Sequence, residues 1–142
     1  MSNEDSLQRF VDAQEKSYAA ALSEIRKGRK ESHWMWYIFP QIKGLGFSST
    51  AQYYAIKHLE EAREFLSHPV LGKRLVDISS ELLKLETSDP HKVMGTPDDL
   101  KLKSSMTLFA AVEDTDPVFT KVLDKFFKGS KDQRTLQLIE KG

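Results

Sequence analysis

The part of this sequence best suited to chemistry is residues 33–48, a segment rich in large aromatic side chains. It contains both tryptophans of the chain, Trp34 and Trp36, and its one full charge is Lys43. Three residues disfavour a continuous helix here: Pro40, Gly44 and Gly46. Irregular backbone ordinarily lies near the surface, so these large rings must either pack inward or meet a ligand. We refer to residues 33–48 as the aromatic loop.

Two interpretations of the rings stay open, and both can hold at once. In the first, four rings anchor a long connection to the core, because aromatic side chains dominate core burial: Trp34, Trp36, Phe39 and Phe47. In the second, Trp34 or Trp36 stacks on a planar ligand. Gln41 would then offer an amide donor and acceptor. The absence of a side chain at Gly44 and Gly46 would let backbone N–H groups approach that ligand closely.

Cationic residues precede the aromatic loop and surround Gly28, namely Arg26, Lys27, Arg29 and Lys30. One interpretation is that they compensate the negative end of a helix and form a solvated face. If they instead fold beside the loop, Arg29 or Lys30 would bind a phosphate group. Ser48 begins the next predicted helix, whose first N–H groups are unpaired, and offers a second anion site. With the aromatic rings, these groups favour a nucleotide-like ligand.

His33 is the best candidate for a catalytic acid or base, because the pKa of a free imidazole lies close to neutrality. The alternative is a hydrogen-bonded structural histidine. His58, His68 and His91 offer no stronger case, and no histidine pair has the four-residue helical spacing of a zinc site with a carboxylate nearby. We therefore expect no metal and no cofactor.

A second polar segment, residues 98–107, combines ion-pairing spacings with hydroxyl groups. Asp98, Lys101 and Ser105 fall near one face of a helix, where Asp98 and Lys101 are spaced for an ion pair. Ser104, Ser105 and Thr107 stand among apolar residues, and a buried hydroxyl needs a partner. We count Lys101 and Ser105 among the candidate ligand-binding residues.

These candidates must be positioned by helices, because strand signals are weak everywhere except at residues 36–39. Apolar residues recur at helical spacing in six segments: residues 6–27, 49–66, 69–83, 97–109, 117–127 and 133–140. Prolines and N-capping residues stand at several starts, and Gly28 and Gly129 supply stops. The sequence predicts an all-α fold of six or seven helices in a single domain, residues 1–142, with the aromatic loop between the first and second helices.

Composition excludes several function classes. The 142 residues include 21 basic and 21 acidic side chains, so no broad positive field exists to attract nucleic acid. The longest uncharged stretches are shorter than the roughly 20 residues that span a bilayer. The first residues lack the pattern of a secretory signal, and the chain has no cysteine. We expect a cytoplasmic protein without a membrane partner, and the sequence leaves its oligomeric state open.

The order of several motifs resembles the domain-of-unknown-function family 1810. The motifs are Arg9-Phe10, Ala13-Gln14, Tyr18, the run from His33 to Gln41, Gly44-Leu45-Gly46, His68-Pro69, Leu71-Gly72, and Lys101-Leu102 followed by Ser104 to Phe109. The resemblance covers nearly the whole chain and implies a mainly helical fold with no established activity. Bacterial members are often labelled calpastatin, although nothing here resembles that disordered, proline-rich inhibitor. Gln14 and Tyr18, which belong to this pattern, complete the candidate ligand-binding set.

A weaker similarity links the chain to NADAR-type helical domains. It rests on Ala13-Gln14, the tryptophan region, Leu71-Gly72-Lys73-Arg74 and residues 122–127. NADAR-type domains act on N-glycosidic bonds of ADP-ribose-like or riboflavin-pathway compounds. This sequence has no match for their catalytic glutamate, so the similarity implies a ligand class and leaves the reaction open.

Two functions are therefore predicted. The leading hypothesis is a small-molecule pocket for a nucleotide-like or ADP-ribose-like ligand, which would be an N-glycosidic hydrolase if it turns its ligand over. The alternative is a protein-interaction module or a homodimerising domain that uses exposed rings of the aromatic loop, Trp36, Phe39 and Phe47. A concave pocket would favour the first function, and a flat aromatic patch would favour the second.

Overall fold

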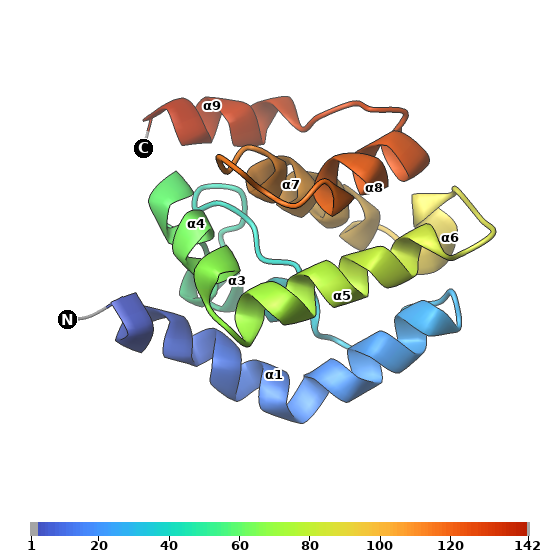
Figure 1. Ribbon diagram of the computed structural model, residues 1–142, viewed down its shortest axis with the longest axis horizontal. Helices are drawn as coiled ribbons and strands as arrows, with labels where there is room; N and C mark the ends of the chain where they lie inside the picture. The colour runs from blue at the N-terminus through green and yellow to red at the C-terminus, as the bar shows by residue number, and fades with distance from the viewer. Residues whose placement is uncertain (1–2, 142) are drawn as a thin grey trace.

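The computed structural model describes the backbone of residues 3–141 and the side chains of residues 7–141, and its regular structure is helical (Figure 1). Nine helices form within these residues: α1 (Asn3–Arg26), α2 (Met35–Ile38), α3 (Ser49–Tyr53), α4 (Leu59–Ser67), α5 (Leu71–Leu83), α6 (Pro90–Met94), α7 (Asp98–Ala110), α8 (Val118–Phe127) and α9 (Gln133–Lys141). The predicted all-α fold is confirmed.

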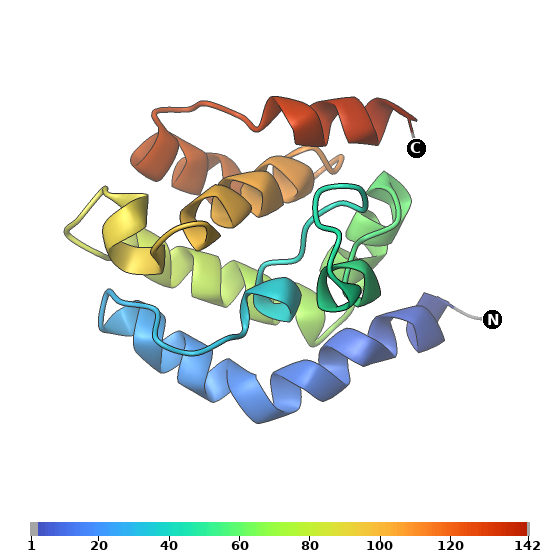
Figure 2. The same cartoon turned by 180° about the vertical axis from the view of Figure 1, so that it is seen from behind.

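The long helices are stacked in layers. α5 packs on α1 on one side and on α8 on the other, and α7 packs on both α8 and α9. α4 joins the other elements by packing on α5 and α7. Seen from behind (Figure 2), the segment between α1 and α4 runs along the face of the molecule between α1 and α7. The aromatic loop lies in this segment, so its surroundings come from both ends of the chain.

A row of fully buried phenylalanines connects the layers. Phe10 of α1 contacts Phe65 of α4 edge-on, with 5.1 Å between ring centroids. Phe65 in turn contacts Phe109 of α7 at 5.4 Å, and Phe109 contacts Phe119 of α8 at 5.8 Å. Edge-on and tilted arrangements place the positive edge of one ring near the negative face of the next. The row packs α1, α4, α7 and α8 together around the core.

The predicted second helix is divided in two by a short backbone pairing. Ile42 and Ile56 form a parallel bridge, in which the Ile56 N–H donates to the Gln41 carbonyl at 2.9 Å and the Lys43 N–H donates to the Ile56 carbonyl at 2.8 Å. Ile56 is fully buried. The expected helix over residues 49–66 therefore becomes α3 and α4. The short α2 and α6 account for the remaining difference from six or seven helices, and residues 36–39 are helical rather than extended through Ile38.

The aromatic loop is tied to the end of α1 by one carboxylate. Glu24 is 6% exposed, and its oxygens accept four hydrogen bonds: from the N–H of Glu31 at 2.6 Å, the N–H of Ser32 at 2.8 Å, the hydroxyl of Ser32 at 2.6 Å and the indole N–H of Trp34 at 2.9 Å. Burial alone would raise the pKa of Glu24, but the hydrogen bonds from Ser32, Glu31 and Trp34 outweigh it and lower the pKa to about 2. The ionised carboxylate therefore stabilises the turn that leads into the aromatic loop.

We predict that Glu24→Gln removes a pH-dependent part of the stability. A carboxyl group whose pKa is lower in the folded state stabilises the fold above its unfolded pKa and loses that contribution as the pH falls towards 2. The near-isosteric amide keeps most of the geometry and loses the charge. Urea denaturation at pH 7 should give a free energy of unfolding about 2 kcal/mol lower for the variant than for the wild type. This difference should shrink as the pH approaches 2.5, and an equal difference at both pH values would contradict the assignment.

Candidate functional site

A cavity of about 360 Å³ opens beside the aromatic loop. α2 contributes Trp36 to its wall, α3 and the residues after it contribute Ala51, Tyr54 and Ala55, and α7 contributes Lys101. The remaining lining residues belong to the loop itself: Gln41, Ile42, Leu45, Gly46, Phe47 and Ser48. A mostly apolar wall with a few polar groups is typical of small-molecule sites. We call this hollow the Trp36 cavity.

Five candidate ligand-binding residues meet in the Trp36 cavity: Trp36, Gln41, Gly46, Ser48 and Lys101. Four of them belong to the aromatic loop, which includes α2, and Lys101 comes from α7, far from the loop in the sequence. The bridge between Ile42 and Ile56 pairs the middle of the aromatic loop with the segment that follows α3. The packing of the molecule then places α7 beside them.

Lys101 is the cation of this cavity. Its ammonium nitrogen lies 5.4 Å from the centroid of the Trp36 ring, within the range of a cation–π interaction. The same nitrogen lies 3.5 Å from a carboxylate oxygen of Asp98, whose other oxygen pairs with Lys30 at 2.9 Å. The Lys101 side chain keeps 29% of its surface exposed. Its charge is thus partly compensated and still reachable from the cavity.

Gln41 is held by its backbone and presents its side chain. Its carbonyl accepts the Ile56 N–H. Within the described part of the chain, no hydrogen bond to the Gln41 side-chain amide is formed, and this half-buried amide lines the Trp36 cavity. It can therefore donate to and accept from a ligand without first breaking an internal hydrogen bond.

The two glycines of the aromatic loop have different functions. A Cβ atom at Gly46 would lie 2.6 Å from the Cβ of Ala51, so the loop and α3 can approach this closely only because residue 46 has no side chain. Gly44 instead adopts a φ of +109° and faces Leu138 of α9, where a Cβ would lie 3.0 Å from a methyl carbon. Gly46 shapes the Trp36 cavity, whereas Gly44 serves packing against α9.

Trp34 does not provide the predicted stacking surface. It is 1% exposed, its indole N–H is bound to Glu24, and its ring packs on the fully buried Phe39 with 6.0 Å between centroids. The anchoring interpretation therefore describes Trp34 and Phe39, and the stacking interpretation is wrong for Trp34. Sequence reasoning missed that a glutamate of the preceding helix would bind the indole in the interior.

The predicted phosphate-binding residues Arg29 and Lys30 do not line the Trp36 cavity. The ammonium of Lys30 is paired with Asp98 and lies 4.9 Å from the Trp34 ring centroid, and its side chain is only 7% exposed. Arg29 is exposed and does not line the Trp36 cavity. Of the predicted cations, only Lys101 reaches this hollow.

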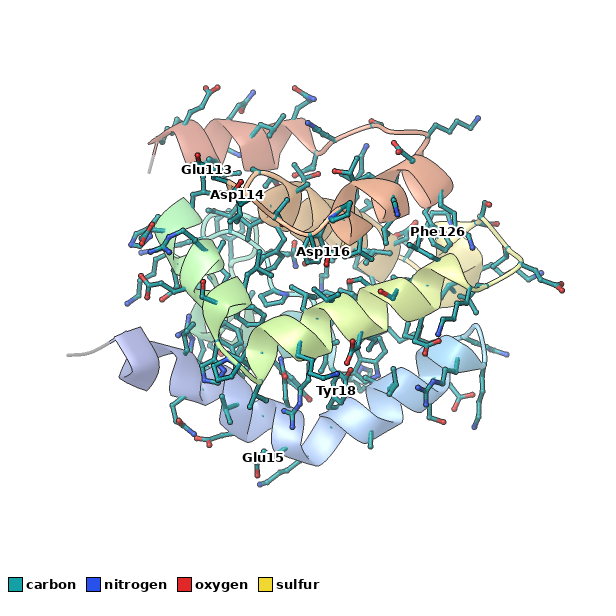
Figure 3. The ribbon with its side chains drawn as sticks, viewed as in Figure 1. Glu15, Tyr18, Glu113, Asp114, Asp116 and Phe126 are labelled. Carbon is teal, nitrogen blue, oxygen red and sulfur yellow. The ribbon has the colours of Figure 1, made fainter. Side chains whose placement is uncertain are left out.

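Gln14 and Tyr18 hold helices together instead of lining the cavity. The buried Gln14 amide donates to the Tyr37 carbonyl at 2.8 Å and so fixes α2 on α1. The Tyr18 hydroxyl donates to the Arg74 carbonyl of α5 at 3.2 Å, and Figure 3 shows Tyr18 between α1 and α5. Burial is the main cause that raises the pKa of Tyr18, so its phenol stays neutral. Both residues connect α1 to its neighbours.

The remaining candidates lie outside the cavity or have a structural partner. His33 is exposed before α2 and is not part of the cavity wall. Ser105 is fully buried one helical turn from Lys101, and its hydroxyl has no hydrogen-bond partner within the described residues. Ser48 lines the cavity, but its hydroxyl caps α3 by accepting the Ala51 N–H at 3.1 Å, and α3 has only five residues. The predicted acid–base function of His33 and the anion site at Ser48 gain no support from this geometry.

Tyr54 is a lining residue that sequence reasoning did not single out. Tyr54 falls within the predicted helix over residues 49–66. In the structure α3 ends at Tyr53, and Tyr54 lines the Trp36 cavity. Its ring lies 5.2 Å from that of Tyr37 and 4.8 Å from that of Tyr53. Burial raises the pKa of Tyr54, and the neighbouring Tyr53 and Tyr37 add to this shift. The adjacent residues Tyr53 and Tyr54 were the signal in the sequence that could have pointed to this part of the cavity wall.

Comparison with known proteins places the whole chain in one family. Residues 4–139 match the model described as a protein of unknown function, DUF1810. The chain belongs to the DUF1810 family. Its fold is similar to the crystal structure of the conserved hypothetical protein Rv1873 from Mycobacterium tuberculosis, with a TM-score of 0.92, 44% sequence identity and coverage of 94% of this chain and 96% of that one. No curated protein matches the chain.

The residues that the structure describes contain no group of three or more histidine, cysteine, aspartate or glutamate side chains placed to hold a metal ion. Among the helices of residues 3–141, none combines the length and the apolar character needed to cross a membrane.

We predict that the two tryptophans respond differently to truncation. Trp34→Ala should lower the free energy of unfolding by about 3–5 kcal/mol, because it empties a core position and leaves the Glu24 carboxylate short of one donor. Trp36→Ala removes a half-buried cavity wall and should cost at most about 2 kcal/mol. Urea denaturation of both variants checks this order. Equal losses would mean that Trp36 is also a core anchor.

Proposed function

We propose that this DUF1810 protein binds a small molecule that carries a planar ring and one anionic group, a nucleotide-like compound, in the Trp36 cavity. The observation that supports the proposal is the meeting of an indole, an amide without an internal partner and an ammonium group in one hollow of about 360 Å³. A hollow of this size lies at the lower end of the usual range for ligand pockets. The ligand would thus be small, closer to a mononucleotide than to a dinucleotide.

The ring of the ligand would lie against Trp36 and Tyr54. Stacking of a nucleobase on an aromatic side chain is worth about 1–3 kcal/mol and tolerates different bases, because every base has a π-face. Discrimination between rings would then come from Gln41, whose amide can pair with both donors and acceptors at a ring edge. Leu45 and Phe47 would cover the apolar remainder.

The anionic group would bind Lys101. This ammonium is shared with Asp98 at 3.5 Å, so the cavity offers less than one full positive charge. Such a site favours a single phosphate or carboxylate over a polyphosphate chain, whose additional charges would meet no further cation among the described lining residues. We therefore favour a nucleoside monophosphate over ADP-ribose within the predicted ligand class.

We propose binding rather than N-glycosidic hydrolysis. General acid–base catalysis needs a carboxyl or imidazole group within hydrogen-bond reach of the substrate. The described residues that line the Trp36 cavity contribute an amide, an ammonium and hydroxyl groups, and none of them is aspartate, glutamate or histidine. The chemistry of this set suits recognition.

A second candidate function is a surface for a protein partner or for a second copy of the chain. It is favoured by two exposed rings, Phe47 at 82% and Tyr53 at 61% exposure. Phe39, which we expected on this surface, is fully buried and does not belong to it. A partner would cover Phe47 from outside, whereas a small ligand would lie deeper, against Trp36 and Gln41.

We predict that AMP binds and that Lys101 recognises its phosphate. Isothermal titration should show that Lys101→Met weakens AMP binding by about tenfold, a loss of about 1.4 kcal/mol, and does not weaken the binding of adenosine. Gln41→Ala should weaken both ligands, because both contain the base. Lys27→Met, which changes an exposed lysine outside the cavity, is the matched control.

Two outcomes would contradict the proposed function or its assignment to this cavity, and a third would favour the second candidate function. Absence of AMP and adenosine binding at millimolar concentration would remove the proposed function. Equal effects of Lys101→Met and Lys27→Met would show that the phosphate is not recognised in this cavity. A concentration-dependent dimer that Phe47→Ala disrupts would favour the second candidate function.

A further inference from the structure

A second cavity, shallow and wide open to solvent, with a volume of about 540 Å³, lies on the neighbouring surface of α2 and α3. Its wall consists of six residues: Trp36, Tyr37, Ser49, Thr50, Tyr53 and Tyr54. Trp36 and Tyr54 also line the Trp36 cavity, so the two hollows are neighbours that share these two rings. We call the second hollow the tyrosine cavity. The proposed nucleotide-like ligand makes no use of it.

The chemistry of the tyrosine cavity differs from that of its neighbour. Its wall combines four aromatic rings with aliphatic hydroxyl groups and contains no lysine, arginine, aspartate, glutamate or histidine. Within the described part of the chain, the hydroxyls of Ser49, Thr50 and Tyr53 form no hydrogen bond, and all three residues are exposed. The cavity therefore offers flat apolar surface and free hydroxyls side by side, without any formal charge.

We propose that the tyrosine cavity binds a neutral carbohydrate. A pyranose ring with equatorial hydroxyls presents faces of axial C–H groups, whose positive hydrogens fit the negative faces of aromatic rings. The hydroxyls at its edge donate and accept, as do those of serine, threonine and tyrosine. A neutral sugar needs no counter-ion, and its two kinds of surface match the two kinds of surface in this wall.

The rings of the cavity are held in place before any ligand arrives. Tyr53 and Tyr54 meet edge-on, with 4.8 Å between centroids and 83° between planes, and the Tyr37 ring lies 5.2 Å from Tyr54. The Arg9 side chain of α1 donates to the carbonyls of Tyr53 at 2.8 Å and Ala55 at 2.9 Å, which fixes the end of α3. Stiff aromatic side chains on a fastened backbone lose little entropy when a ligand binds.

Two other ligand classes fit this wall less well. An ionic ligand would meet no opposite charge in the described wall. A quaternary ammonium ion would use aromatic faces through cation–π attraction, but it has no group that could bond the hydroxyls of Ser49 and Thr50. The tyrosine rings also contact one another at 4.8 and 5.2 Å, so these pairs leave no space for a cation between them. A carbohydrate uses both components of the wall.

The test is saturation-transfer NMR and titration of the full chain with three neutral disaccharides: cellobiose, lactose and N,N′-diacetylchitobiose. We expect at least one of them to bind at millimolar concentration, with the strongest transfer to the C–H protons of its ring. Tyr53→Ala should weaken this binding at least tenfold, and Tyr53→Phe should weaken it less because the ring is kept. Tyr53 is 61% exposed, so both variants should fold, which thermal unfolding verifies.

Phe47→Ala is the matched control, because Phe47 is an exposed ring that lines the Trp36 cavity and not the tyrosine cavity. It should leave disaccharide binding unchanged. Failure of AMP binding with intact disaccharide binding would overturn the proposed function alone. The carbohydrate proposal is overturned if none of the three sugars binds, or if Tyr53→Ala and Phe47→Ala have equal effects.

Discussion

The buried carboxylate of Glu24 determines how the chain leaves α1. An ionised group that is 6% exposed is tolerated only if its oxygens are bonded, and here Glu31, Ser32 and Trp34 supply the four donors. These bonds fold the start of the aromatic loop back on the helix and place the Trp34 indole in the core. Trp36, two residues further on and inside the short α2, then lies on a different side of the backbone and lines both cavities. Trp34 is thus anchored in the core, whereas Trp36 lines the two cavities.

Two further polar side chains of α1 also bind the backbone of short segments of the chain. Gln14 donates to the Tyr37 carbonyl of α2, and Arg9 donates to the carbonyls of Tyr53 and Ala55 at the end of α3. Helices of four or five residues are not stable by themselves in water. Their position therefore depends on these long-range hydrogen bonds and on the buried bridge between Ile42 and Ile56. The walls of both cavities are thus built on elements that the long helix holds in place.

The long helices were predictable because their apolar residues recur at the helical period and their ends carry proline, glycine or capping residues. Part of the site was predictable for a related reason: Trp36, Gln41 and Gly46 stand in a segment that cannot be one helix. The partners of Trp34 and Ile56 were not, since both depend on residues distant in the sequence. The pattern around residues 49–66 satisfies one long helix equally well, and only the pairing of Ile56 with Ile42 divides it.

Trp36 and Tyr54 line two cavities of different electrostatic character, and Lys101, which lines the Trp36 cavity and not the tyrosine cavity, makes the difference. The Lys101 ammonium lies 5.4 Å from the Trp36 ring centroid, in the space over the ring that a stacked ligand would also occupy. A planar ligand must therefore displace this cation towards Asp98, whose carboxylate is 3.5 Å away. That displacement costs a cation–π contact of about 0.5–1 kcal/mol at a partly exposed site. An anionic group on the ligand offsets the cost by pairing with the same ammonium, whereas a neutral ring gains no such compensation. Under the proposed function, the Trp36 cavity would therefore favour a ligand that combines a ring with a negative charge, whereas the uncharged wall of the tyrosine cavity would make no such demand.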